Sequence, residues 1–485
     1  MESNVREIKE KCSVFSKCVD VDLDFQENLM SYNDDLLKII RCCINNFVVN
    51  TDYNNGVLTV YGKSKIFLTY VSDASSNITT ADFEEDFQKS INIDGNFEDV
   101  SADVIVINRY SNFRVINQRR IDIHNAFALN IKLCACTPVK MVDEAENILI
   151  RRDTVSYLSL VGTSFARAEF EEETIIPADS DTVRKIINTF SSVHCDDTKI
   201  IKNKMLVKAT AEFSLLYTTD TDNETVRKCE KSVSISKIID LNGIDEGDNA
   251  IVNLAIGNMY VKPKADKNNE LRLIELIGDI NVNVSVFRKV TAQLSTDSYA
   301  TDTEINNTLS KISLNTNGEF VSDIINGKTA FQFENIKIVE VIDLSLNLSD
   351  GRNLELTAFV RNQNSELVYI SQRKEIEISS FSASAVYIKS FDYVMNSDNE
   401  IGIRYLLEYN AVSFEEKTFS VVSDIQVTDN AVADSPALVV YFADENEALW
   451  DIAKKFRTSV ELIKTENELK EDVLSSKRIL LIPGM

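Results

Sequence analysis

The feature that most constrains this chain is a segment that occurs three times at nearly even intervals. The recurring positions are Lys38-Ile39-Ile40, Lys185-Ile186-Ile187 and Lys337-Ile338-Val339 at one end, and Leu68 with Tyr70, Leu215 with Tyr217 and Leu367 with Tyr369 at the other. Both ends are offset by 147 residues between the first two copies and by 152 between the last two. The sequence therefore predicts three copies of one structural unit, aligned without a gap over this segment.

Each copy is predicted to consist of β-strands. Segments 57–73 and 205–220 alternate polar and apolar residues and are rich in β-branched and aromatic side chains, as half-buried strands are. A later alternating run also recurs, at Ile121, Ile123, Phe127, Leu129 and Ile131, at Ile274, Leu276, Ile280, Val282 and Val284, and at 401–414. Turns such as 53–56 separate the strands, and long alternating helices are missing. We therefore expect three tandem antiparallel β modules, at 1–150, 151–312 and 313–428.

A different pattern follows a predicted linker at 429–437. Residues 437–443 form an apolar run, and apolar residues then recur with the spacing of one buried helix face, at Leu449, Ile452, Ala453 and Phe456. Thr458 and Glu461 have the spacing of a capping box, which predicts that a second helix starts at Thr458. A second apolar run, 479–482, ends at Pro483. The predicted fold class is thus mainly β, with three β modules followed by a small βααβ domain at 438–485.

Residues 438–483 resemble a LysM module, because the LW–IA–F spacing, Asn467 after the second helix and the terminal Ile-Pro occur in order. The resemblance implies a shallow groove for N-acetylglucosamine polymers, between the loops 444–449 and 466–469. Asn446 stands at a turn position where Gly is usual, and Asn tolerates the positive φ that such a turn needs. Ala448 lacks the hydroxyl that the family offers to sugar, which favours a protein ligand.

The residues we expect to line this groove or to contact a partner are Asp444, Asn446, Glu447, Ala448, Leu449, Trp450, Ile463, Asn467 and Leu469. Leu449 and Trp450 are adjacent on a helix, so their side chains point about 100° apart and cannot both face one core. We expect Leu449 to face inward. Trp450 is predicted either to pack in the core or to lie beside the groove as an anchor for a partner.

The repeated unit, with a leading segment such as 174–187, resembles the spore-coat-associated SPOCS β domain. SPOCS repeats followed by a LysM module resemble the SipL-type family of spore coat morphogenetic proteins. The resemblance implies a non-enzymatic coat scaffold in the mother-cell cytoplasm at the forespore surface. Its implied partners are a SpoIVA-type coat morphogenetic ATPase and other coat proteins. Two departures are Arg361 in place of Gly62 or Ala209, and Met30 in place of Pro177.

Charge and targeting signals exclude several other classes. The chain of 485 residues has 51 Lys and Arg against 76 Asp and Glu, a net charge of −25, so a phosphate backbone would be repelled and no nucleic acid is expected as a partner. The N-terminus shows no apolar core of a secretory signal. No run approaches the roughly 18 apolar residues that span a bilayer, so we expect no transmembrane segment.

The sequence offers little for chemistry. His124 and His194 are the two histidines, and the adjacency of His194 to Cys195 does not by itself place a base against a thiolate. Cys134 and Cys136 alternate on one strand face but lack the second pair that a zinc site needs. No phosphate-binding glycine loop is present. We therefore expect no enzyme, no catalytic residue, no cofactor and no metal.

Two other functions remain open from the sequence. A glycan-binding protein of the cell wall or cortex would use the LysM groove for peptidoglycan, and would need an export route. A phage-tail-type adaptor is the other alternative, since LysM modules also occur in such assemblies.

Overall fold

The computed structural model describes residues 3–95, 97, 100–220, 225–349, 352–377, 381–431 and 437–484. The first unit contains β1 (Ser3–Asn28), β2 (Leu36–Asn54), β3 (Val57–Ser72), β4 (Ile78–Asn92), β5 (Ser101–Asn117) and β6 (Arg120–Ala145). The second contains β7 (Ile148–Ile175), β8 (Val183–Ile201), β9 (Lys204–Thr219), β10 (Val226–Asp240), β11 (Asn249–Ala265) and β12 (Leu271–Ala300). The third contains β13 (Thr303–Gln332), β14 (Ile338–Ser349), β15 (Asn353–Asn362), β16 (Leu367–Glu375), β17 (Ala383–Ser397) and β18 (Glu400–Ala431).

Within the described residues every unit repeats one topology of two antiparallel three-stranded sheets. The larger sheets have the orders β1-β6-β5, β7-β12-β11 and β13-β18-β17, and the smaller ones β2-β3-β4, β8-β9-β10 and β14-β15-β16. The larger sheets of units two and three meet where Thr316 pairs with Tyr157. The two sheets of unit two enclose one core, in which Leu276 and Val282 of β12 pack with Val207 and Phe213 of β9. The prediction of a mainly β, antiparallel fold is confirmed.

The predicted register holds between units one and two. Strands β2 and β3 correspond to β8 and β9 at the offset of 147. The later run corresponds as well, since Ile121 pairs with Glu27 and its counterpart Ile274 pairs with Thr174. The partners Glu27 and Thr174 are again 147 residues apart, whereas Ile121 and Ile274 are 153 apart. All ten apolar residues predicted for this run in the two units are buried. Alternation along a half-buried strand therefore fixed which face lies inward.

The gapless alignment with unit three is wrong. Ile186 pairs with Tyr217 between two bulges, and the pair in the same position of unit three is Val341 with Val360. Tyr369, the predicted counterpart of Tyr217, lies instead in the next strand, β16. The reason is length: β14 and β15 have 12 and 10 residues, whereas β8 and β9 have 19 and 16. A shorter hairpin moves every later residue to a different strand position.

The three small sheets form a closed ring. The fourth strand of a unit lies against the second strand of the next, so that β4 contacts β8, β10 contacts β14 and β16 contacts β2. Side chains make the same links: Lys185 Nζ donates to Thr79 Oγ1 at 2.7 Å, Lys228 lies 3.9 Å from Asp343, and Lys38 lies 3.5 Å from Glu366. Closure between units three and one gives the ring an approximate threefold arrangement.

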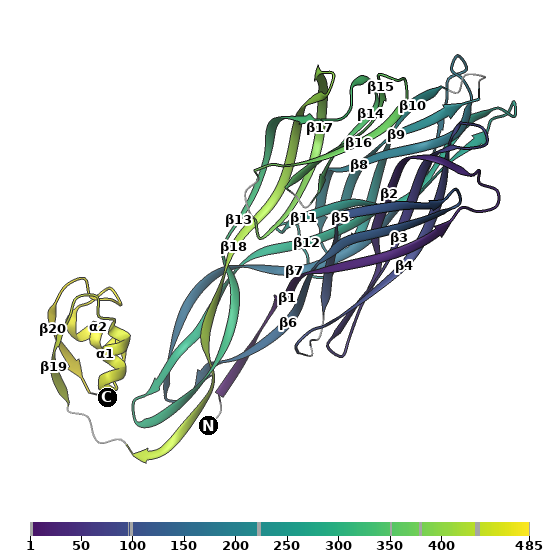
Figure 1. Cartoon of the computed structure of the whole chain (residues 1–485). Coiled ribbons are helices and arrows are strands. Elements are labelled where there is room, and N and C mark those ends of the chain that lie inside the picture. Colours follow the sequence, from purple (N-terminus) through teal and green to yellow (C-terminus); the bar gives the residue numbers. More distant parts are fainter. Residues whose placement is uncertain are drawn as a thin grey trace.

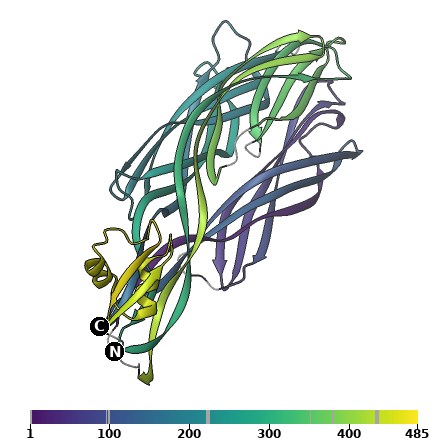
Figure 2. The same cartoon turned by 90° about the vertical axis from the view of Figure 1, so that its left-hand side faces the viewer.

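The outer parts of the large sheets leave this ring as a stalk. The strand pairs β1–β6, β7–β12 and β13–β18 twist together and extend away from the small sheets (Figure 1). A core runs between the three pairs and includes Met141, Tyr157, Leu294, Ile312 and Val421. Both chain termini lie at the far end of the stalk (Figure 2). The molecule is thus a head that narrows into a stalk.

The C-terminal domain contains β19 (Leu438–Ala443), α1 (Leu449–Phe456), α2 (Val460–Asn467) and β20 (Arg478–Pro483), and β19 and β20 pair antiparallel. The predicted start of the second helix is one residue early. Ser459, not Thr458, is the N-cap, and its side chain accepts a hydrogen bond from Leu462 N at 3.1 Å. Thr458 instead follows the C-cap of the first helix: Arg457 is the left-handed cap residue, and Thr458 N donates to Ala453 O at 3.0 Å.

The turns between strands suggest different unit edges from those expected. β6 and β7 are separated by residues 146–147, and β12 and β13 by residues 301–302. The expected edge at residue 312 falls inside β13. We therefore propose units at 3–145, 148–300 and 303–431. Most of the expected linker, 432–436, lies outside the described residues.

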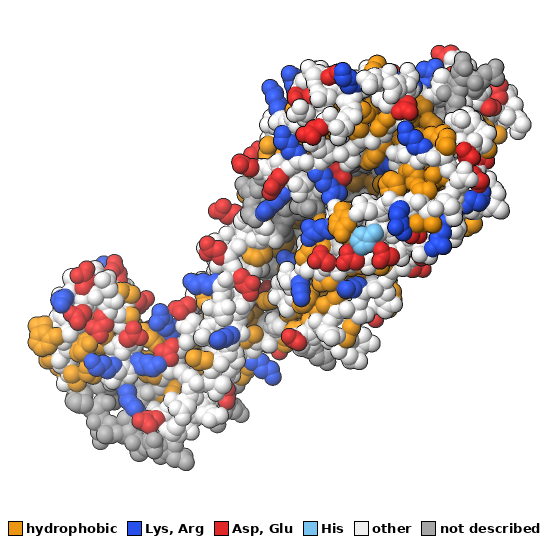
Figure 3. Space-filling model, in the orientation of Figure 1, with side chains coloured by type: hydrophobic (Ala, Val, Ile, Leu, Met, Phe, Trp, Pro, Cys, Tyr) orange, Lys and Arg blue, Asp and Glu red, His pale blue; other side chains and the backbone are white. Residues whose placement is uncertain are grey.

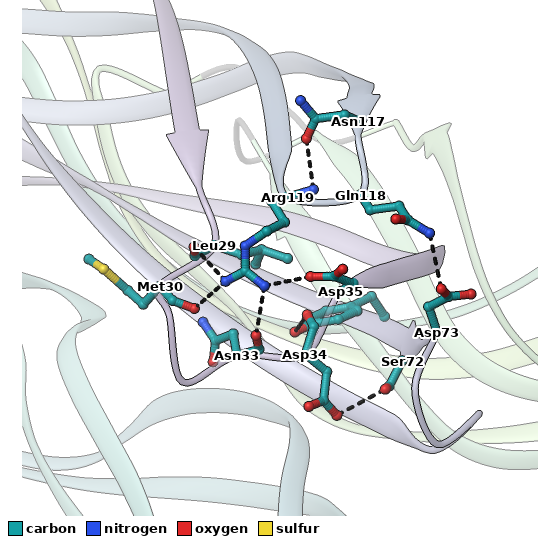
Figure 4. Close-up of polar contacts among 11 residues, drawn as sticks. Leu29, Met30, Asn33, Asp34, Asp35, Ser72, Asp73, Asn117, Gln118 and Arg119 are labelled. Atoms are coloured by element: carbon teal, nitrogen blue, oxygen red, sulfur yellow. Dashed lines mark hydrogen bonds and ion pairs between the residues drawn. The ribbon is translucent and has the colours of Figure 1, made fainter.

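One arginine fixes the loop between β1 and β2 in the first unit (Figure 4). Arg119 donates to the carbonyl oxygens of Leu29, Met30 and Asn33 and pairs with the carboxylate of Asp35. In the second unit Arg272 donates in the same way to Pro177 O at 2.9 Å. The guanidinium holds the carbonyl of residue 30 or 177, which explains why Met30 can replace Pro177 without changing the loop.

Candidate partner-binding site

Two of the nine residues expected at the groove belong to the core of the C-terminal domain. Leu449 and Ile463 are fully buried, together with Ile452, Leu480 and Ile482. The helices lie on one side of the β19–β20 sheet, so these side chains meet between helix and sheet (Figure 1). Leu449 faces inward as expected, and neither Leu449 nor Ile463 is available to a ligand.

The first loop is held by Glu447. Its carboxylate accepts hydrogen bonds from Tyr441 Oη at 2.7 Å and from Asp444 N at 3.0 Å. The hydrogen bond to Glu447 raises the pKa of Tyr441. Asn446 has φ of 66°, the conformation for which Asn was expected to substitute for Gly. Asp444 points outward and pairs with Lys477 at 2.8 Å.

Backbone hydrogen bonds join the first loop to a second one. Asn446 N donates to Leu474 O at 2.8 Å, Leu474 N donates to Glu447 O at 3.0 Å, and Leu449 N donates to Asp472 O at 2.8 Å. Ala448 also bridges to Val473. The loop that faces residues 444–449 is therefore 472–474, not the expected 466–469. The backbone hydrogen-bonding groups of the two loops are therefore already paired with one another at the place where a sugar would be expected to bind.

Asn467 connects the second helix to the sheet. Its Nδ2 donates to Ile463 O at 2.8 Å and to Leu481 O at 2.7 Å, while its Oδ1 accepts from Leu481 N at 2.7 Å. The Nδ2 and the Oδ1 of the Asn467 amide are thus both directed into the domain by these bonds. Leu469 is half-buried against the same core. Asn467 is thus a structural clamp between α2 and β20.

Trp450 contacts the stalk. Its Nε1 donates to Asp297 Oδ2 at 2.9 Å, and its ring lies edge-on to Tyr299 with the centroids 4.9 Å apart. Lys454 Nζ binds both oxygens of Asp297 at 2.7 Å. Partial burial opposes the ionisation of Asp297, but the hydrogen bonds from Lys454 and Trp450 outweigh it and hold its pKa below the usual value. Of the two expected roles, packing is the one observed, but Trp450 packs against the stalk as well as against its own domain.

Further bonds link the C-terminal end of α1 to the turn between β12 and β13. Tyr299 is almost fully buried and donates from Oη to Thr458 O at 2.6 Å. Arg457 reaches Thr303 O and Glu304 Oε1, both at 3.5 Å. Sequence reasoning missed this contact surface, because nothing in the spacing of 297–304 relates it to residues 150 positions later.

The sheet of the C-terminal domain has a second apolar face. Leu438 is 51% exposed, Val440 57%, Phe442 74% and Ile479 57%. The strand register pairs Phe442 with Ile479, Val440 with Leu481 and Leu438 with Pro483, so all six lie on the face opposite the helices. We did not predict this face. The available signal was the unbroken apolar run 437–443, since a two-stranded sheet covered on one side needs alternation.

The structure places His194 and Cys195, the adjacent pair considered as a catalytic candidate. His194 lies 3.2 Å from Asp196, and burial raises the pKa of Cys195 to about 11, which opposes formation of a thiolate. Among the described residues no group of three or more His, Cys, Asp or Glu could hold a metal ion. Across the same residues no helix is long and apolar enough to cross a membrane.

Two family models match the chain. The model described as SipL, SPOCS domain matches residues 182–264, which comprise β8 to β11 of unit two, and the LysM domain model matches residues 445–483. Comparison with curated proteins and with solved structures gives no match. The two domains confirm the resemblance to the SipL-type architecture and support a sporulation coat-related protein with a LysM module. Both families are non-catalytic.

Proposed function

We propose that this protein is a non-enzymatic scaffold of the spore coat, which docks through its LysM module on a SpoIVA-type coat ATPase at the forespore surface. The SPOCS and LysM matches support the link to the coat. The fold supports a scaffold, because the ring and the stalk join three units and the LysM module in one continuous framework.

The observation that favours a protein ligand over a glycan is the hydrogen bonding between the loops 444–449 and 472–474. The backbone groups of Asn446, Glu447 and Leu449 are bonded to residues 472–474, and Ala448 offers no hydroxyl. A sugar is recognised by polar groups that converge on it, and a polar group already bonded within the protein is lost to the ligand. These three backbone groups are therefore already used within the module and are not offered to N-acetylglucosamine.

The β units would engage the same partner or other coat components. A long strand at the edge of a sheet presents unpaired N–H and C=O groups, to which an extended segment can add. Strand β5 is at such an edge, and residues 108–117 of it are exposed. Several weak contacts on one framework would raise the effective concentration of each, which suits assembly on a polymerising surface.

The test is binding of the full chain, in parallel, to a purified SpoIVA-type ATPase and to peptidoglycan or chitin oligomers. We expect binding to the ATPase and none to the glycans. Binding to the glycans alone would contradict the proposal and favour a wall or cortex protein. Binding to neither would also contradict it.

A further inference from the structure

The fold of the LysM module leaves the outer face of its β19–β20 sheet uncovered. Of its six side chains, Leu438, Val440, Phe442 and Ile479 are exposed, and Leu481 and Pro483 are partly buried. They lie in two adjacent strands, so they form one continuous strip. Contiguous exposed apolar side chains on a soluble domain mark surfaces that bind other molecules, whereas isolated ones need no explanation.

The docking of the module on the stalk fixes the direction of this strip. Helix α1 faces the stalk through Trp450, Lys454 and Arg457. The sheet lies on the other side of the helices, so its outer face is turned away from the stalk at the tip of the molecule (Figure 1). Hydrophobic side chains gather at that tip in the space-filling view (Figure 3). The strip is thus presented to a partner without obstruction by the head.

Charge argues against a membrane and against a second copy as the occupant. None of the six side chains is charged, and the exposed residues beside them are two acidic ones, Asp444 and Glu445, and two basic ones, Lys477 and Arg478, with Lys477 paired to Asp444. Anionic lipid surfaces attract basic clusters, which this rim lacks. Two copies would each bring a net charge of −25. Repulsion of that size requires a large interface to overcome it.

The size of the strip identifies the shape that fits it. Six residues at about 3.3 Å each give a length of roughly 20 Å, and two strands about 4.8 Å apart give a strip roughly 10 Å wide with side chains. An α-helix is about 10 Å across and covers 20 Å in about 13 residues.

Taken with the proposed function, on which it rests, this geometry leads us to propose that the outer face of β19–β20 binds the apolar side of an amphipathic helix on the coat partner. The helix would lie along the two strands and present apolar residues at positions i, i+3, i+4 and i+7. Phe442, the most exposed of the six, would be the central anchor.

The experiment compares two double variants of the full chain for binding to the purified SpoIVA-type ATPase. Val440→Thr with Phe442→Ser replaces two of the exposed apolar side chains of the strip, including the proposed anchor. Leu462→Ser with Val473→Thr replaces two exposed apolar side chains elsewhere on the same module. We expect binding to weaken at least about tenfold for the first and less than about twofold for the second. Emission from Trp450 reports whether each module remains folded and docked.

The outcomes separate the two proposals. Failure of the unaltered chain to bind the ATPase would overturn the proposed function together with this inference. Equal binding by the chain and the Val440/Phe442 variant would overturn this inference alone. Dimerisation that the variant abolishes, or binding of the unaltered chain to phosphatidylglycerol vesicles, would assign the strip to a different occupant.

A photo-crosslinking side chain at position 442 provides a second measurement that does not depend on the stability of a variant. We expect crosslinks to one segment of the partner, with attached residues spaced three or four apart. Crosslinks spaced two apart would indicate a strand and would overturn the assignment of a helix.

Discussion

At the scale of single residues, one position of the repeated unit holds a different polar residue in each of the three units of the ring. Arg41, Asn188 and Asp343 each follow a bulge in the second strand of their unit. Arg41 donates to Asn188 Oδ1 and lies over the ring of Tyr369, 4.9 Å from its centroid. Asp343 is buried, accepts from Ser214 Oγ at 2.9 Å and has Lys228 3.9 Å away. The same backbone position thus joins each unit to a neighbour by different polar groups.

Burial raises the pKa of Asp343 to about 6, despite the hydrogen bond from Ser214 and the charge of Lys228, while Glu230 raises it further. The folded state therefore holds this proton more tightly than the unfolded state, and the free energy of unfolding falls as pH rises from about 4 to about 6. In Asp343→Asn this loss is absent. We expect the free energy of unfolding of Asp343→Asn, relative to that of the unaltered chain, to rise by roughly 1 kcal/mol between pH 5 and pH 8.

Urea unfolding at a series of pH values measures this effect. Asn347→Ala is the control, because it removes a hydrogen bond to Ser345 in the same strand without adding or removing a titrating group and without altering a hydrogen bond of Asp343. Its difference from the unaltered chain should change much less with pH. A constant difference between Asp343→Asn and the unaltered chain would contradict the prediction.

The cap of α2 gives a second prediction at this scale. Ser459→Ala removes the hydrogen bond to Leu462 N and should destabilise the LysM module by about 1 kcal/mol. Thr458 is fully buried and its Oγ1 has no hydrogen-bond partner, so Thr458→Val should cost nothing or stabilise. Thermal unfolding followed by Trp450 emission distinguishes them. The reverse order of stability would show that Thr458 is the cap after all.

At the scale of elements, short turns and long strands determine what the LysM module can touch. Strands β12 and β13 have 30 residues each and are joined by two residues, so their turn reaches the end of the stalk. Asp297 and Tyr299 lie at this end and meet α1. Trp450 is consequently an internal contact between the stalk and the LysM module, and it is the one tryptophan of the chain.

Loss of the Asp297 carboxylate should release the module. Asp297→Ala removes the partner of both Trp450 Nε1 and Lys454, and leaves these two groups without that acceptor. We expect emission from Trp450 to move to longer wavelength and acrylamide to quench it more strongly. Asp302→Ala, an exposed residue of the same turn, is the control and should change neither. Unchanged emission in Asp297→Ala would show that the other contacts suffice to hold the module.

At the scale of the whole molecule, the closed ring couples the three units. A core between them contains Ile187 and Phe190 of unit two and Phe359 of unit three, with Ile40 of unit one packed against it. Phe359 is fully buried, with its ring centroid 6.1 Å from that of Phe190. Apolar surface shared between units makes each unit depend on the others for its burial.

Phe359→Ala should therefore destabilise all three units together. Removal of a buried Phe costs about 3–5 kcal/mol, and the loss should appear as a lower midpoint of one common transition in calorimetry. Phe331→Ala is the comparison, because Phe331 lies in a core made of unit-three residues. If either variant splits the transition so that a single unit melts early, the units are not coupled as we expect.

The sequence by itself determined the local and periodic features of this protein. Alternation identified the strands and the buried faces of β6 and β12, helical spacing identified α1, and the offset of 147 residues aligned β2 and β3 of unit one with β8 and β9 of unit two. These features depend on residues near one another in the chain, where strand and helix periods act directly. The inward direction of Leu449 and the turn at Asn446 were predictable for the same reason.

Only the tertiary structure decided which distant segments meet. The shortened hairpin of unit three, the closure of β16 on β2 and the contact of Trp450 with Asp297 each depend on how whole units are placed, which no local period records. The exposed face of β19 and β20 was likewise undecided, because an apolar run does not reveal which of its sides the rest of the protein covers. Burial is a property of the assembled chain, and the sequence states only which residues favour it.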